Sequence, residues 1–65
     1  MIIKSLQIKK IMADNGMTIC KLAKLAGMQP ANLGRIIRNG RCSIPSAGKI
    51  ARALGVDLET IMEEE

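Results

Sequence analysis

Single glycines divide this chain of 65 residues into short segments, and each segment carries apolar side chains at helical spacing. The glycines stand directly after the apolar segments, at Gly16, Gly27, Gly40 and Gly55. A glycine in this place is typical of a helix end, because a residue without a Cβ adopts the left-handed conformation at little cost. Apolar residues three and four positions apart indicate amphipathic helices rather than strands. The pattern therefore predicts an all-α fold, a compact five-helix domain that covers residues 1–65.

Residues that can cap a helix stand before the apolar segments. Thr18 and Ser43 carry hydroxyls that can accept a hydrogen bond from a free backbone N–H, and Asp57 carries a carboxylate suited to the same role. Pro30 and Pro45 fit the first turn of a helix, where no intrahelical partner needs their missing N–H. We therefore expect helices over residues 5–15, 19–26, 30–39, 44–54 and 58–62.

The predicted core contains aliphatic, methionine and alanine side chains, because the chain has no aromatic residue. A core of this size contributes only about 3–5 kcal/mol of stability. The side chains expected to face it are Leu6, Ile8, Ile11, Met12, Leu22, Leu25, Ala26, Leu33, Ile36, Ile37, Ile44, Ala47, Ile50, Ala51 and Leu54.

The formal net charge of +4 is unevenly distributed along the chain. Residues 1–41 hold eight lysines and arginines against one aspartate, a net charge of +7, whereas residues 42–65 carry a net charge of −3. Basic surfaces attract nucleic acid or anionic membranes, although a solvated lysine-rich surface would give the same composition. We expect Lys9 and Lys10 to be such solvated residues. The final glutamates, residues 63–65, are expected to be a disordered, solubilising end.

Catalytic, metal-binding and membrane-spanning roles find no support in the sequence. The chain has no histidine, and Cys20 and Cys42 are not spaced as zinc ligands or as a redox pair. We expect both to be reduced thiols in a cytoplasmic protein, with no metal or cofactor. No base is available to activate a nucleophile, so an enzyme is the least supported reading. No apolar run approaches the roughly 18–20 residues that span a membrane.

The most informative stretch covers residues 18–39. Two helices that cross steeply over a three-residue turn need particular residues in register. Ala23 is small where the second helix crosses the first, and Gly27 supplies the turn conformation. Apolar residues that would hold the pair together from beneath are Leu22, Ala26, Met28, Leu33 and Ile36.

With these residues the sequence resembles the lambda-repressor-like, Cro/repressor-type helix-turn-helix domains, the XRE family. The resemblance extends from about residue 8 to residue 61. A helix-turn-helix match alone is moderately specific, but flanking features add to it. They are Gly16-Met17-Thr18, Leu22-Ala23, Ala26-Gly27, Leu33 with Ile36, Asn39-Gly40, and Lys49-Ile50-Ala51-Arg52-Ala53-Leu54-Gly55-Val56.

The resemblance implies a recognition helix over residues 30–38 that lies in the major groove of double-stranded DNA. Base reading then falls to Gln29, Ala31, Asn32 and Arg35. Asparagine can bridge adenine and arginine can bridge guanine, so we expect Asn32 and Arg35 to be the main readers. Ala31 suits a thymine methyl group, and Pro30 is expected to set the helix start.

The same resemblance implies phosphate contacts and a partner subunit. Phosphate contacts are expected from Thr18, Ile19, Lys21, Arg38, Asn39 and Arg41. Such proteins bind pseudo-palindromic operators as two-fold dimers, so a homodimer is expected, at least on DNA. Its predicted interface is Leu58, Ile61 and Met62.

The sequence departs from the family in several places. Many members pair an arginine in the first helix with a glutamate at the end of the third, whereas Met12 and Ile37 stand there, which predicts an apolar contact. The residue after Leu33 is often serine in the family but is Gly34 here, which removes one phosphate hydrogen bond. Gly34 and Gly48 each cost about 1 kcal/mol relative to alanine inside a helix, and close backbone approach is one explanation.

Two functions fit these features. The first is a transcriptional regulator, a repressor of phage or mobile-element type. The second is an antitoxin or protein-interaction module that keeps the helix-turn-helix fold. The polar residues Asn32, Arg35 and Arg38 favour DNA over an apolar protein partner, but the sequence has no segment that decides whether the chain also neutralises a toxin.

Overall fold

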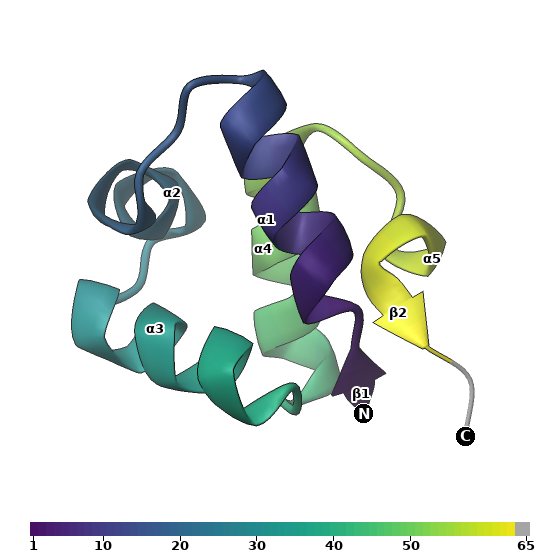
Figure 1. Cartoon of the computed structure of the whole chain (residues 1–65). Helices are drawn as coiled ribbons and strands as arrows, with labels where there is room; N and C mark the ends of the chain where they lie inside the picture. Colours follow the sequence, from purple (N-terminus) through teal and green to yellow (C-terminus); the bar gives the residue numbers. More distant parts are fainter. Residues whose placement is uncertain (64–65) are drawn as a thin grey trace.

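The computed structural model describes residues 1–63, and within them five helices and two short strands form the domain (Figure 1). The elements are β1 (Ile2–Ile3), α1 (Ser5–Asp14), α2 (Ile19–Ala26), α3 (Pro30–Asn39), α4 (Ile44–Leu54), α5 (Leu58–Ile61) and β2 (Met62–Glu63). The all-α class and the five helices are confirmed. The helix limits agree with the expected ones to within a residue at each end.

Local chemistry sets most helix ends. The Thr18 hydroxyl accepts a hydrogen bond from the backbone N–H of Lys21 at 3.2 Å, and the Ser43 hydroxyl caps α4 in the same way. Gly27, which follows α2, has the left-handed φ of 72° expected of a helix end. Asp57 lies at the N-cap of α5, but its carboxylate forms no capping hydrogen bond, contrary to expectation. A backbone bond from Thr60 N–H to the Asp57 carbonyl, 3.0 Å, closes this short turn instead.

The two strands were not predicted. β1 pairs antiparallel with β2, so that Ile2 lies opposite Glu63 and Ile3 opposite Met62. The prediction that residues 63–65 are disordered is therefore wrong for Glu63, and residues 64 and 65 lie outside the described chain. No local pattern announced this pairing, because its two partners are about sixty positions apart in the sequence.

The first residues also fasten the loop that follows α3. The N–H of Ile3 donates to the Gly40 carbonyl at 2.9 Å, and the N–H of Cys42 donates to the Met1 carbonyl at 3.1 Å. Ile2 forms an isolated antiparallel bridge with Arg41. The segment 1–3 thus lies between the loop after α3 and the end of the described chain, and holds both in place.

One core collects a side chain from every helix. The large side chains with the least exposure are Ile8, Leu22, Leu33, Ile50 and Ile61, one each from α1 to α5. Met12 and Ile37 are buried in the same cluster, as expected for an apolar contact in place of an ion pair.

Three residues predicted to face the core lie at the surface instead. Leu6, Leu25 and Ile44 are 67, 55 and 63% exposed. At 3.6 residues per turn, Leu6 lies on nearly the opposite side of α1 from Ile8, and Leu25 lies outside the face of α2 that is covered. Ile44 is the first residue of α4, almost a turn before Ala47, where burial begins.

Candidate nucleic-acid interface

The helix-turn-helix is formed by α2 and α3, which are joined by the three residues from Gly27 to Gln29. Figure 1 shows α2 almost end-on while α3 runs across the view, so the two helices cross steeply. Ala23 is fully buried, and its carbonyl accepts the N–H of Met28 at 2.9 Å, which fixes the turn. The helix α2 packs against both α3 and α4, and α3 keeps one face free.

The free face of α3 carries the predicted base readers. The opposite face is buried through Leu33, Ile36 and Ile37. Ala31 and Arg35 are exposed, Asn32 is half-buried, and Gln29 is exposed at the N-cap position. The structure therefore brings all four predicted base-reading residues to the first two turns of one helix.

Asn32 and Arg35 are bonded to each other. The Nη2 group of Arg35 donates to Oδ1 of Asn32 at 2.8 Å, across one helical turn. Side chains three residues apart are neighbours on a helix surface, so the spacing allows this pair, which links the two main predicted base readers. The bond orients the guanidinium and leaves most of its five N–H donors available.

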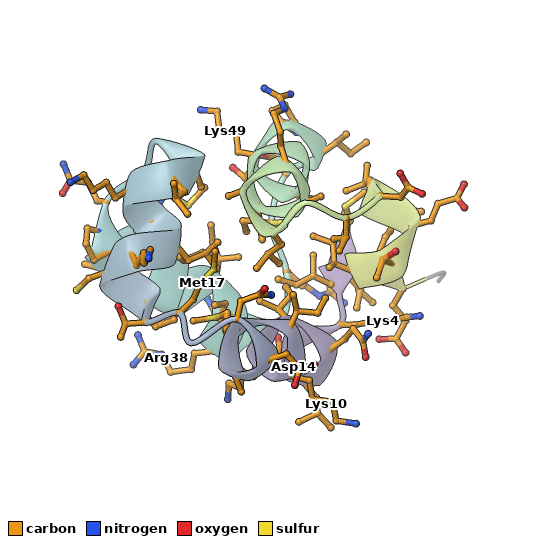
Figure 2. The ribbon with its side chains drawn as sticks, turned by 90° about the horizontal axis from the view of Figure 1, so that it is seen from above. Lys4, Lys10, Asp14, Met17, Arg38 and Lys49 are labelled. Carbon is orange, nitrogen blue, oxygen red and sulfur yellow. The ribbon has the colours of Figure 1, made fainter. Side chains whose placement is uncertain are left out.

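The predicted phosphate-binding residues lie around α3. Lys21, Arg38 and Asn39 are exposed, and α2 begins at Ile19, whose N–H has no intrahelical partner. The Thr18 hydroxyl is already used as an acceptor for the N-cap bond. Arg38 lies at the edge of the molecule beside α1, away from Lys49 of α4 (Figure 2).

Arg41 follows the end of α3 and is exposed. Its backbone is held by the bridge to Ile2, so the position of its side chain depends on the N-terminal strand. That dependence was not visible in the sequence.

The predicted dimer patch must be corrected at one residue. Ile61 is 0% exposed and belongs to the core of its own chain, because α5 packs against both α1 and α4. It therefore offers no surface to a partner. Leu58 and Met62 remain partly exposed.

A surface hollow, not predicted from the sequence, lies between α1 and α3. Its volume is about 620 Å³, and its lining residues are Ser5, Leu6, Lys9, Ile19, Gly34, Ile37 and Arg38. At its inner wall the Ser5 hydroxyl donates to the Ile37 carbonyl at 2.7 Å, which ties α1 to α3. The signals in the sequence were Gly34 in the middle of a helix and the misassigned Leu6.

Close packing within the chain does not explain either helical glycine. A Cβ added at Gly34 or at Gly48 would meet no atom within 4 Å. At Gly34 the missing side chain opens the hollow. Nothing in the structure explains Gly48.

The thiols and carboxylates of residues 1–63 form no recognisable reaction centre. Cys20 is an exposed free thiol and Cys42 is a half-buried one. Burial raises the pKa of Cys42, an effect that the nearby N-terminal ammonium partly opposes. The described part of the chain contains no cluster of three residues suited to a metal ion and no helix long and apolar enough to cross a bilayer.

Comparison with known proteins bears on this geometry. A family model described as a Cro/C1-type HTH DNA-binding domain matches residues 7–65, from the first turn of α1 to the end of the sequence. No curated protein and no solved structure matches the chain. The match spans both helices of the helix-turn-helix and the exposed face of α3, and it agrees with the lambda-repressor-like resemblance. The chain therefore belongs to the Cro/C1-type helix-turn-helix domains, the DNA-binding domains of transcriptional regulators.

Proposed function

We propose that the protein is a transcriptional repressor, of the phage or mobile-element kind, that inserts α3 into the major groove of a specific double-stranded DNA site. The observation that carries the proposal is the free face of α3. It presents an amide, a guanidinium and a methyl group from Asn32, Arg35 and Ala31, while the other face is locked into the core. A helix of this width fits the major groove, where these groups can distinguish bases.

Each reading residue has a definite role in the proposal. Arg35 bridges O6 and N7 of a guanine, and Ala31 contacts a thymine methyl group. Asn32 keeps its bond to Arg35 and offers its amide N–H₂ to a neighbouring base. Gln29, exposed at the start of the helix, reads a base edge or a phosphate.

Phosphate contacts on both sides of the groove position the reading helix. The start of α2, at Thr18 and Ile19, places a helix N-terminus toward one strand, a favourable site for an anion. Lys21 contacts the same strand, as does Arg38, which lies with Ile19 around one hollow, and Asn39 and Arg41 contact the other strand beyond α3. Such contacts give affinity and orientation without specifying sequence.

The proposed oligomer on DNA is a two-fold dimer. Equivalent half-sites one helical turn apart are separated by roughly 34–36 Å, whereas the longest extent of one domain is 29 Å. One copy therefore cannot occupy both half-sites, but two adjacent copies can. Leu58 and Met62 are the partly exposed apolar residues proposed for the contact, without Ile61.

A role as antitoxin or interaction module without DNA binding has less support. The cores of protein interfaces are depleted in charged residues, whereas the most accessible face of α3 carries Arg35 and Arg38.

The proposal is tested by selection of bound sequences from a randomised DNA library. The wild-type protein should enrich a pseudo-palindrome, and Arg35→Ala should relax the preference at one base position and cost about 1–3 kcal/mol in binding. Arg52→Ala, which removes the same charge from an exposed position of α4, is the matched control and should keep the preference. Enrichment of no sequence above a salt-sensitive background would refute specific DNA reading.

A further inference from the structure

The hollow between α1 and α3 combines apolar walls with two cations. Leu6, Ile19 and Ile37 supply aliphatic surface, and Lys9 and Arg38 supply positive charge from two different helices. No carboxylate is among its lining residues. The hollow thus suits a ligand that alternates apolar and anionic groups.

The hollow also borders the free face of α3, which carries the proposed base readers. Gly34 and Arg38 are four residues apart on α3 and therefore lie on one ridge of the helix. Arg38 is in turn three residues after Arg35, so this ridge is adjacent to the one that carries the base reader. Ile19, the first residue of α2, lines the other side. DNA that lies along α3 must therefore pass the mouth of the hollow.

We propose that this hollow receives a sugar–phosphate segment of the bound DNA, with Lys9 and Arg38 holding one phosphate from two sides. Leu6 and Ile19 contact the adjoining deoxyribose rings. The inference rests on the proposed function and extends the DNA footprint onto α1. Lys9, expected from the sequence to be a solvated residue, becomes a phosphate-binding residue.

The proposed DNA contact explains why residue 34 is a glycine. A glycine inside a helix lowers stability relative to alanine, and no neighbour in the chain requires it, since an added Cβ meets nothing within 4 Å. The missing side chain leaves room for the backbone of the DNA to approach α3 closely. The proposed ligand, rather than packing within the fold, thus accounts for Gly34.

An acidic, partly apolar peptide is the competing occupant, because it shares the alternation of charge and apolar surface. DNA is favoured because Ile19, at the start of α2, and Arg38, three residues after Arg35, both line the hollow, and the proposed complex already places these two residues against DNA. A peptide would use the hollow alone and would compete with DNA.

The test measures affinity for the selected DNA site as a function of salt concentration. Lys9→Gln should weaken binding equally for all sequences and reduce the slope of log affinity against log salt by about 0.9, the value for one lost phosphate contact. Lys10→Gln is the matched control, because Lys10 neighbours Lys9 in the sequence, is exposed and does not line the hollow. Lys10→Gln should change the slope by less than half as much as Lys9→Gln.

A second pair of variants fills the hollow directly. Gly34→Leu should raise the melting temperature, because leucine is a better helix former than glycine, yet lower DNA affinity at least tenfold. Gly48→Leu makes the same exchange on α4, outside the hollow, and should leave DNA affinity unchanged. Loss of binding in a more stable protein separates a blocked site from a damaged fold.

The outcomes separate this inference from the proposed function. If the wild type binds its selected site, but Lys9→Gln matches Lys10→Gln and Gly34→Leu binds as tightly as wild type, the inference is overturned and the function stands. If the wild type selects no DNA, both are overturned. If Gly34→Leu keeps DNA affinity but loses binding to a polyglutamate–leucine peptide that the wild type binds, the hollow is a peptide site and the inference is also wrong.

Discussion

Removing Asn32 should weaken DNA binding largely through Arg35. The two side chains share a hydrogen bond of 2.8 Å from Arg35 Nη2 to Asn32 Oδ1. A guanidinium has five N–H donors, and a bidentate contact with guanine uses two of them. The bond to Asn32 can therefore persist in the complex, where it holds the guanidinium in the plane of the base.

The expected magnitudes follow from this shared bond. Arg35→Ala should cost about 1–3 kcal/mol, the value of a bidentate base contact. Asn32→Ala frees the arginine, and immobilising a flexible side chain again costs about 0.5–1.5 kcal/mol. In a protein that lacks Arg35, the Asn32→Ala substitution no longer adds the cost of immobilising that side chain. The double variant should therefore lose about 0.5–1.5 kcal/mol less than the sum of the single losses.

A double-mutant cycle measured by fluorescence anisotropy on the selected DNA site tests this coupling. The cycle should be repeated on a site with the guanine read by Arg35 replaced, where the coupling should disappear. Unfolding by urea controls for stability, because an exposed pair of this kind contributes only about 0.2–0.5 kcal/mol to the helix. Losses that add to within about 0.3–0.5 kcal/mol would show that the bond does not persist on DNA.

Three other predictions concern the fold and the thiols. Ser5→Ala removes the 2.7 Å bond between α1 and a carbonyl of α3 and should cost about 1 kcal/mol. Thermal denaturation should then show a melting temperature about 4–8 °C lower, and an unchanged value would mean that the bond adds nothing. Ile61→Ala empties a fully buried site and should cost about 2–5 kcal/mol, whereas Leu25→Ala, at an exposed site, should cost about 0.5 kcal/mol or less in urea unfolding. Equal losses would contradict the assignment of the core. The raised pKa of Cys42 leaves less reactive thiolate at pH 8, so mass spectrometry should find Cys20 alkylated first by iodoacetamide, and the reverse order would contradict it.

The family match and the exposed residues of α3 show how far local chemistry reaches. A capping hydroxyl at Thr18, a glycine at residue 27 and apolar residues three and four apart act within one or two turns of chain. The helices and the helix-turn-helix were therefore predictable. So was the presence of Arg35 on the side of α3 away from the core, because helical periodicity alone assigns it there.

Which side chains of each helix would be buried was less predictable. Periodicity gives the direction of a side chain but not how far the neighbouring helices extend. Leu6, Leu25 and Ile44 each lie near an apolar stripe, and each is exposed because no other element reaches it. The prediction for Ile61 was wrong in the opposite sense. It was expected at the surface, but α1 and α4 cover it completely.

What the sequence alone determined was the set of helices, their ends and the chemical groups on the reading helix, because these depend on residues close together in the chain. Tertiary structure alone decided the pairing of Ile2 with Glu63 and the meeting of Lys9 with Arg38 around one hollow. Both join residues 29 or more positions apart. Such contacts arise only when the folded core brings distant segments together, and no periodicity or motif in the sequence indicates which distant residues will meet.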